Sequence, residues 1–207
     1  PASDAQTHPV LILMHGAGGN AYGMINQYMG LEDYILVALQ GYDNRWNIRT
    51  ESSKADDLDY IVNIINQLKT YSDVDADNIS LLGSSNGAAM VNRAMIELPW
   101  GTFKNAISLA SQLTTDQYNN NSFWGDANND GNYDTSYTLS SSLRALSLHG
   151  TNDTTIPYDG GTVNWLSRTF IEAKQSILNI ATGLGYVGAQ VNGTTPFNNT
   201  NIVKYEY

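Results

Sequence analysis

Six short apolar runs divide the chain at intervals that suit β-strands. Each is four to six residues long, and they lie at residues 10–14, 34–39, 79–82, 106–109, 143–148 and 202–207. An aliphatic run such as Val-Leu-Ile-Leu-Met at 10–14 is typical of a strand that is covered on both faces. The pattern therefore predicts a buried sheet whose strands are spread along the whole chain.

Between most of these runs the apolar residues follow helical spacing. Two segments show it clearly, residues 54–69 through Leu58, Ile61, Ile65 and Leu68, and a later one through Leu166, Phe170, Ala173, Ile177 and Ile180. Strands that alternate with amphipathic helices predict an α/β sandwich around a mostly parallel sheet. In such sheets the chemistry lies beyond the carboxyl ends of the strands.

Residues 114–142 have a different character. They are rich in Asn, Asp, Ser, Thr, Tyr and Gly, and we expect a long surface excursion over the edge of the sheet where substrate-contacting loops are found. No internal repeat and no linker separates the chain into parts, and 207 residues with 42% hydrophobic content suit one core. We expect a single domain over residues 1–207.

Composition narrows the classes of partner. A net charge of −10 and a pI near 4.4 argue against nucleic acid or an anionic membrane as binding partner, because both bind to clusters of Lys and Arg. The absence of cysteine excludes disulfides, zinc–thiolate sites and a thiol nucleophile. No apolar run approaches the roughly 18 residues that a membrane span needs. The polar segment 1–9 suits either a processed N-terminus or a cloning boundary, and the acidic, Lys/Arg-poor composition favours an exported protein.

The strongest chemical signal is a Gly-x-Ser-x-Gly pentapeptide at 83–87. An apolar strand precedes it and a helix-forming stretch follows it. A serine that attacks a carbonyl stands on a strained strand-to-helix turn, and the flanking glycines let strand and helix approach each other. This context predicts a nucleophile elbow with Ser85 as nucleophile. The alternative is a flexible Gly/Ser turn.

A glycine-rich segment follows the first predicted strand. Residues 15–20 read His-Gly-Ala-Gly-Gly-Asn, and glycines let backbone N–H groups turn toward a developing oxyanion. With Ser85 as nucleophile, the N–H of Asn86 is one predicted donor and that of Ala17 the other. The alternatives are a simple turn or a phosphate-binding loop, although the lysine that a phosphate loop needs is not nearby.

An aspartate follows the strand predicted at 143–148. Asp153 comes after the serine in sequence, as the order Ser, Asp, His requires, and it would orient an imidazole. The alternative is a turn-capping Asp. The three histidines, His8, His15 and His149, all precede Asp153, and we expect His15 and His149 to fix loops rather than to transfer protons. A triad base is therefore missing.

Together these motifs resemble the polyhydroxybutyrate depolymerase and feruloyl esterase branch of the α/β-hydrolases. The resemblance covers nearly the whole chain, through the motifs at 15–19, 44–47, 56–61, 83–90 and 149–161. It implies an α/β-hydrolase fold and a secreted serine esterase with Ser85 as nucleophile, Asp153 as acid, Ala17 and Asn86 as oxyanion donors, and Trp46 near the acyl-binding cleft.

Two departures from the family's pattern stand out. Family members usually carry disulfides, with a cysteine where Ala17 stands. The family also places its histidine shortly after a strand resembling 202–207, so we expect a polypeptide that lacks its C-terminal segment and with it the catalytic base. The rival interpretation is a natural pseudoenzyme.

Two weaker patterns remain. The segment Asp126–Asp134 matches the first half of a calcium loop, but Tyr137 stands where the bidentate Glu belongs, and an Asx-rich turn is the favoured alternative. Aromatic residues in predicted loops could form a stacking cleft or could be isolated surface residues: Trp46, Tyr118, Trp124, Tyr133 and Tyr158.

The sequence thus predicts a carboxylic ester hydrolase that acts through an acyl-enzyme on a polyester or a hydroxycinnamoyl- or acetyl-type ester. No metal or organic cofactor is required. The main alternative is a catalytically silent domain that binds a polymer. A peptidase or lipase on the same fold is a third candidate.

Overall fold

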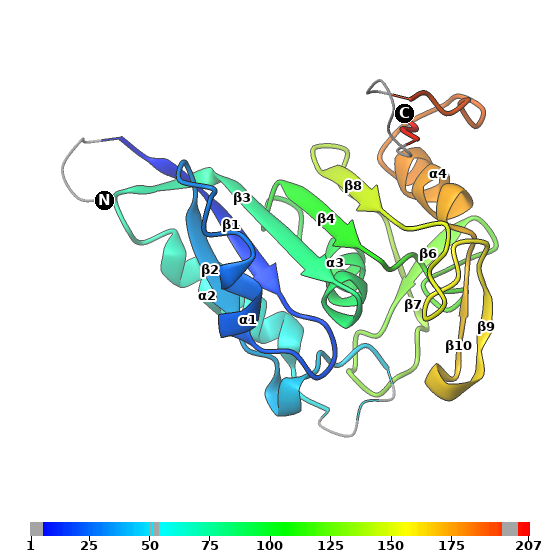
Figure 1. The fold of residues 1–207 in the computed structure, drawn as a ribbon, viewed down its shortest axis with the longest axis horizontal. Coiled ribbons are helices and arrows are strands. Elements are labelled where there is room, and N and C mark those ends of the chain that lie inside the picture. The colour runs from blue at the N-terminus through cyan, green and yellow to red at the C-terminus, as the bar shows by residue number, and fades with distance from the viewer. Residues whose placement is uncertain (1–5, 50, 52–53, 196–202) are drawn as a thin grey trace.

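A five-stranded parallel sheet forms the centre of the protein (Figure 1). The computed structural model describes residues 6–49, 51, 54–195 and 203–207. The strands are β1 (His8–Met14), β2 (Ile35–Leu39), β3 (Val74–Ser84), β4 (Asn105–Leu109) and β8 (Arg144–Leu148), in the order β2-β1-β3-β4-β8. All four pairings are parallel, so every strand ends at the same edge of the sheet. Five of the six predicted strands, and the mostly parallel sheet, are confirmed.

The sixth predicted strand, at 202–207, does not form in the part that the structure describes. Residue 202 lies outside the described residues, and Lys204 makes only an isolated antiparallel bridge to Thr194. The alternating sequence suits a strand, but no neighbour in the central sheet pairs with it there. The prediction was wrong for these residues.

Helices cover the two faces of the sheet unequally. Helices α2 (Asp57–Leu68), α3 (Asn86–Glu97) and α4 (Ala173–Gly183) share one apolar cluster with the sheet, whereas α1 (Ala21–Asn26) packs on the other face. Strand β1 divides its side chains accordingly, because successive residues of a strand point to opposite faces. Val10, Ile12 and Met14 lie in the larger cluster, and Leu11 and Leu13 in the smaller one.

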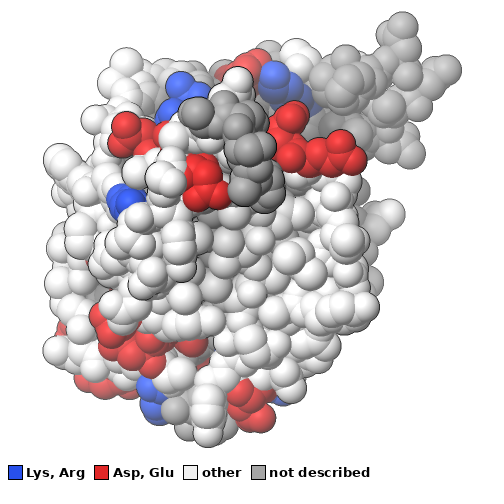
Figure 2. Space-filling model, turned by 90° about the vertical axis from the view of Figure 1, so that its left-hand side faces the viewer, with Lys and Arg blue, Asp and Glu red and all other residues white. Residues whose placement is uncertain are grey.

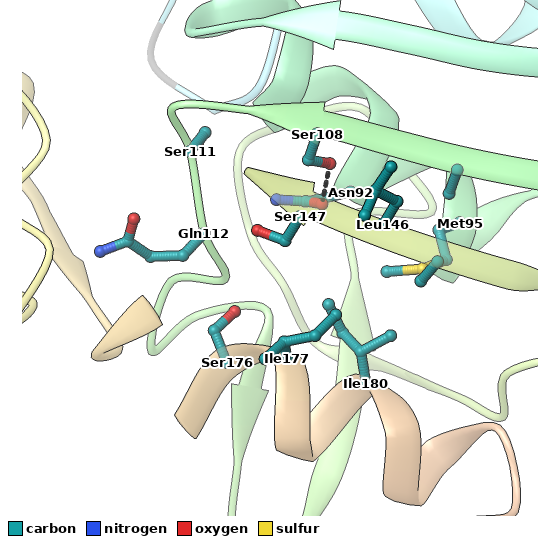
Figure 3. Close-up of a pocket in the computed structure, with 12 residues that line it drawn as sticks. Asn92, Met95, Ser108, Ser111, Gln112, Leu146, Ser147, Ser176, Ile177 and Ile180 are labelled. Carbon is teal, nitrogen blue, oxygen red and sulfur yellow. Dashed lines mark hydrogen bonds between the residues drawn. The ribbon is translucent and has the colours of Figure 1, made fainter. Parts of the chain in front are cut away.

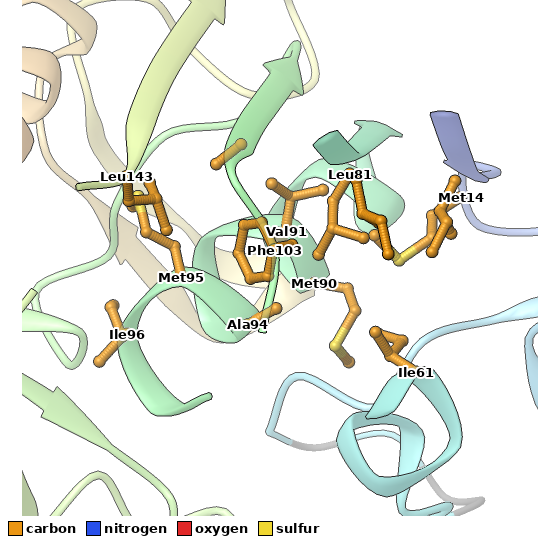
Figure 4. Close-up of a cluster of buried hydrophobic side chains, with 14 of the residues drawn as sticks. Met14, Ile61, Leu81, Met90, Val91, Ala94, Met95, Ile96, Phe103 and Leu143 are labelled. Carbon is orange, nitrogen blue, oxygen red and sulfur yellow. The ribbon is translucent and has the colours of Figure 1, made fainter. Parts of the chain in front are cut away.

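Helix α3 lies at the middle of the larger cluster (Figure 4). From Gly87 to Ile96 every residue of the helix is buried. On α2, Ile61 and Ile65 are fully buried, as the helical spacing predicts, and Asp56 caps the helix by accepting from the N–H of Asp59. The helix that follows the predicted nucleophile is thus held on all sides.

The second predicted helix starts later than its apolar spacing indicates. Leu166 belongs to a 3₁₀ turn, η2 (Asn164–Leu166), and Phe170 to a hairpin of β9 (Gly161–Val163) and β10 (Arg168–Phe170). Left-handed backbone at Ser167 interrupts a helix here whatever the spacing of Leu166 and Phe170. Only the part of the pattern from Ala173 onward is helical.

The polar segment 114–142 is not a surface excursion throughout. It contains a small antiparallel sheet of β5 (Tyr118–Asn119), β6 (Ser122–Gly125) and β7 (Thr135–Tyr137), which contacts α3. Phe123 and Leu139 join the main core, and Gln117 and Asp126 are almost fully buried. The polar composition did not indicate this burial, because buried polar groups such as the Asp126 carboxylate are stabilised by hydrogen bonds within the protein.

Acidic groups are unevenly spread over the surface. Figure 2 shows the side on which β2 and α2 lie, where red groups gather near the upper and lower margins and a broad area between them carries no charge. The chain from Pro9 to Tyr42 contains only two charged residues, Glu32 and Asp33. Among the described residues, no helix combines the length and apolarity needed to cross a membrane.

Candidate active site

Ser85 stands on a strained turn between β3 and α3. Its φ of 53° and ψ of −115° lie outside the conformations that non-glycine residues ordinarily adopt. The flanking glycines explain how strand and helix come so close. A Cβ on Gly83 would lie 2.1 Å from the carbonyl oxygen of Gly87, and one on Gly87 would lie 2.2 Å from that of Met14. The turn has the geometry of a nucleophile elbow and a fixed backbone.

The glycine-rich segment forms a tight turn against Ser85. The Gly19 N–H donates to Gly16 O at 3.0 Å, and the Gly18 N–H donates to Asn44 O at 2.8 Å, with Gly18 at a φ of 77°. A Cβ on Gly16 would lie 3.5 Å from that of Ser85, so the turn and the serine are in contact. These bonds do not use the N–H of Ala17, which remains on the turn beside Ser85.

Asn86 is the first residue of α3. The first N–H groups of a helix have no intrahelical acceptor, so the N–H of Asn86 is available beside Ser85. The N-terminus of α3 carries the positive end of the helix dipole, which also stabilises a negative charge beside Ser85. The two predicted oxyanion donors therefore come from two loops that meet at the serine.

His15 is buried and fixes the glycine-rich turn. The Gly41 N–H donates to its Nε2 at 3.1 Å, so Nδ1 carries the proton and donates to Gly16 O at 2.8 Å. Both ring nitrogens are thus engaged in positioning the loops, as predicted from sequence. His8 lies at the start of β1, the opposite end of that strand from the site.

Trp46 is fully buried beneath this turn. Its indole N–H donates to His15 O at 2.8 Å, and its ring lies 5.3 Å from that of His15. The Asn86 amide holds the Trp46 backbone, with Oδ1 accepting from its N–H at 2.7 Å and Nδ2 donating to its carbonyl at 3.1 Å. In this structure the ring supports the loops around the serine and does not face an open acyl-binding cleft.

Asp153 follows β8, two strands away from Ser85. Its Oδ1 accepts from the N–H groups of Thr155 and Ile156, at 2.8 and 2.9 Å. Oδ2 lies 3.6 Å from His149 Nε2, which itself donates to Ile156 O at 2.8 Å. Two strand spacings amount to about 10 Å. An imidazole could therefore stand between the serine and the aspartate.

None of the three histidines supplies that imidazole. Each is held away from Ser85 by its position or by its own hydrogen bonds, and His149 is directed to the loop 153–156. Beside Asp153 runs an open groove of about 610 Å³, whose lining includes His149, Tyr158, Lys174 and Tyr205. The structure thus assembles the serine and its donors in one place, whereas the predicted acid lies next to a groove that its neighbours Thr151 and Asn152 line.

The calcium-loop pattern at Asp126–Asp134 has another use in the structure. Asp126 is buried, and its two carboxylate oxygens accept from the N–H groups of Asp130 and Gly131. Asp130 turns to the N–H of Asn132 instead of joining Asp126. Among the described residues, no group of three or more His, Asp or Glu side chains is arranged to hold a metal ion.

The loop aromatics do not gather at the serine. Tyr118 packs on Phe123, Trp124 donates to Asn119 O, Tyr133 donates to Ile48 O, and Tyr158 packs on His149. These contacts belong to different parts of the molecule. The stacking cleft expected as one alternative is not formed by these side chains together.

A small polar cavity lies between the sheet and α4 (Figure 3). Ser108 donates to Asn92 Oδ1 at 2.8 Å, while Asn92 Nδ2 and Gln112 Oε1 have no partner among the described residues. The cavity volume is about 10 Å³. That suits a single buried water and excludes a substrate.

Comparisons with known proteins bear on the fold. No family model and no curated protein matches the chain. A carboxylesterase from Bacillus cereus matches with a TM-score of 0.57 and 15% identity, over 86% of this chain and 75% of that one. A thermophilic esterase from Thermogutta terrifontis matches with a TM-score of 0.51 and 17% identity, over 77% and 66%.

A third solved structure extends the same result. It is described as a dipeptidyl aminopeptidase IV from Bacteroides ovatus and matches with a TM-score of 0.59 and 15% identity, over 89% of this chain but only 28% of that one. Together with the parallel sheet, these similarities show that the chain has the α/β-hydrolase fold. Sequence identities of 15–17% indicate a shared fold and not a shared function.

Proposed function

We propose that the protein is a serine carboxylic ester hydrolase. The observation that supports this most directly is the strained backbone of Ser85, held between two glycine close approaches and beside the N–H groups of Ala17 and Asn86. Strain of this kind persists only where the surrounding structure enforces it, and it clusters at functional sites. The fold is shared with carboxylesterases, which is consistent with the same chemistry.

In the proposed reaction the Ser85 hydroxyl attacks the ester carbonyl and loses its proton to an imidazole. The N–H groups of Ala17 and Asn86 donate hydrogen bonds to the oxyanion that forms. The alcohol leaves with that proton, and water then releases the acid from the acyl-enzyme. Asp153 orients the imidazole, which comes from outside these 207 residues because none of their histidines reaches Ser85.

The finer proposal concerns the substrate and its setting. The motifs resemble polyhydroxybutyrate depolymerases and feruloyl esterases, so we propose a polyester or a hydroxycinnamoyl- or acetyl-type ester as substrate. The acidic, Lys/Arg-poor composition supports a secreted protein that binds neither nucleic acid nor membranes.

A second candidate is a polymer-binding domain without turnover. One observation favours it, namely that no imidazole lies between Ser85 and Asp153. The two candidates differ in whether Ser85 can form a covalent bond. They are therefore separated by labelling rather than by binding.

The test is covalent labelling with a fluorophosphonate in the presence of added imidazole, which replaces the absent base. The site of modification is located by peptide mass spectrometry in the wild type, Ser85→Ala and Ser84→Ala. Ser84 is the matched control because it is the adjacent serine of the same turn. Labelling of Ser85 that survives Ser84→Ala and disappears in Ser85→Ala supports the esterase. No labelling, or equal labelling in Ser85→Ala, overturns it and favours the binding domain.

A further inference from the structure

A short segment beside the elbow has every backbone N–H and carbonyl group bound by a side chain. It consists of residues 46–49, here called the strap, and it belongs to no helix or sheet. Asn86 binds the N–H and the carbonyl of Trp46. The N–H of Asn47 donates to Asp57 Oδ2 at 2.6 Å, and its carbonyl accepts from Arg93 at 2.7 Å.

The rest of the strap is held in the same way. Glu51 Oε2 accepts from the N–H groups of both Ile48 and Arg49, each at 2.8 Å. The Ile48 carbonyl accepts from the Tyr133 hydroxyl at 2.5 Å, and the Arg49 carbonyl accepts from Lys54 at 3.1 Å. Buried loops are rare because their backbone groups are hard to satisfy. Here side chains from nearby residues and from distant segments together do so.

Arg93, one of the strap's two partners on α3, is itself buried. Arg93 is 3% exposed and also contacts Glu97 Oε1 at 3.0 Å and the backbone carbonyl of Asp126 at 3.0 Å. Burial raises the pKa of Asp57, whose carboxylate still accepts the Asn47 N–H. Burying an ionisable group costs free energy, but its hydrogen bonds are stronger than those between neutral groups. The strap is therefore a rigid element rather than a mobile loop.

The strap connects the two elements that carry the oxyanion donors. On one side Asn86 and Arg93 attach it to the first and third turns of α3. On the other side the Trp46 indole donates to His15 O, and the adjoining Asn44 carbonyl accepts from the Gly18 N–H. It thus lies between the helix of Asn86 and the turn of Ala17.

We propose that the strap sets the spacing between the N–H groups of Ala17 and Asn86, with the Asn86 side chain and Arg93 as positioning residues. The proposal rests on the proposed function in so far as the two N–H groups serve an oxyanion. Asn86 then has two roles, since its backbone donates to the substrate and its amide fixes the strap. A purely structural strap would stabilise the fold without affecting the donors.

The test compares Asn86→Ala, which removes both amide bonds and keeps the backbone N–H, with Asn86→Asp, which keeps only the acceptor for the Trp46 N–H. The matched control is Asn105→Ala, because Asn105 also donates one amide hydrogen bond, to Ser80 at 2.8 Å, but lies at the amino end of β4. Turnover of p-nitrophenyl acetate is measured as kcat and KM. Residual catalysis without a triad base reflects the oxyanion hole and binding, so the chain itself is suitable.

We expect kcat to fall about 10-fold in Asn86→Ala, part of the roughly 10²–10³-fold loss that follows removal of a whole donor. KM should stay within a factor of about two, Asn86→Asp should be intermediate, and Asn105→Ala should match the wild type. An unchanged kcat in Asn86→Ala, or an equal fall in Asn105→Ala, would overturn the proposal. If Asn86→Ala does not fold, the Asn86→Asp comparison decides alone.

A second readout separates this proposal from the proposed function. Amide hydrogen exchange is measured over residues 15–20, which share no covalent neighbour with Asn86. Faster exchange there in Asn86→Ala, but not in Asn105→Ala, supports the strap even if Ser85 proves unreactive. Unchanged exchange at 15–20 would show that the strap does not hold the turn of Ala17.

Discussion

The two halves of the candidate site differ in how completely this chain builds them. At the ends of β1 and β3, Ser85 lies among glycine close approaches and a strap whose backbone is fully bound by side chains. At the end of β8, the residues just before Asp153 line an open groove, and the buried His149 Nδ1 has no partner among the described residues. Leu146 and Leu148 on β8 are half exposed.

This difference shows that the residues around Ser85 are packed more tightly than those around Asp153. A strained serine with φ of 53° needs close packing to remain in place, and α3 and the strap supply it. An aspartate that only orients an imidazole needs no strain, and two backbone N–H groups are enough to fix it. The serine half should therefore be sensitive to mutation, and the aspartate half tolerant.

The largest expected effect is on the buried charge that connects the serine half. Arg93→Met leaves Glu97 and Asp126 buried without their cation, and breaking such a pair costs about 3–5 kcal/mol of unfolding free energy. Urea denaturation measures the loss. Arg144→Met is the control, because Arg144 is exposed on β8 and should change stability little. Similar losses in both variants would refute the contrast between the halves.

The next effect concerns the close approach under the elbow. Gly87→Ala places a methyl group 2.2 Å from the Met14 carbonyl, a backbone atom that cannot rotate away. We expect about 1–3 kcal/mol of destabilisation, as in other overpacked cores, together with weaker labelling of Ser85. Gly30→Ala is the matched control, since a Cβ there meets nothing within 4 Å. Equal stability of the two variants would mean that α3 can shift without cost.

The two carboxylates that bind the backbone of the strap, Glu51 and Asp57, should affect the pH dependence of stability with opposite signs. Burial raises the pKa of Glu51, but the Arg168 guanidinium and the Arg49 N–H lower it further than burial raises it. Its stabilisation is thus present above the unfolded pKa of about 4.3 and is lost as the pH falls through the lower folded value. Glu51→Gln should cost about 1 kcal/mol at pH 7, the typical net value of a hydrogen bond, and less in acid.

Asp57 should show the reverse. Burial is the main cause of its raised pKa, so its charge opposes folding at neutral pH and this cost disappears as the pH falls through the raised value. Asp57→Asn should therefore gain stability relative to the wild type at pH 7 and lose that advantage in acid. Urea denaturation of both variants from pH 7 to pH 4 provides the measurement. Parallel pH profiles for the two would contradict the assignment.

The elbow could be predicted from sequence because its signals are local. A strand, a Gly-x-Ser-x-Gly turn and a helix are adjacent along the chain, and periodicity identifies each of them. The strap could not be predicted, since half of its backbone hydrogen bonds involve Asn86, Arg93 and Tyr133, which are 40 to 85 residues away from the groups they bind. Only tertiary structure brings such side chains to one backbone.

Two of the wrong predictions, the early helix start and the surface loop, also arise from contacts between residues distant in the sequence. Leu166 and Phe170 fit a helical spacing, but the hairpin of β9 and β10 pairs its backbone instead and turns at Ser167 in the left-handed region. Polar residues of 114–142 suggested a surface loop, whereas Asp126 and Gln117 are buried among hydrogen-bonding partners. Spacing and polarity describe a residue's preference, and long-range pairing decides between the alternatives.

The smallest effect is expected on the open side of β8. Leu148 is 50% exposed. It pairs with Leu109 of β4, so both side chains lie on the sheet face that α1 covers only in part. Leu148→Lys should change the unfolding free energy by less than about 0.5 kcal/mol, as exposed substitutions usually do. Leu81→Ala, in the buried core of β3, should cost about 2–5 kcal/mol. A large loss from Leu148→Lys would show that this face is covered in solution, and the two halves of the site would then be equally constrained.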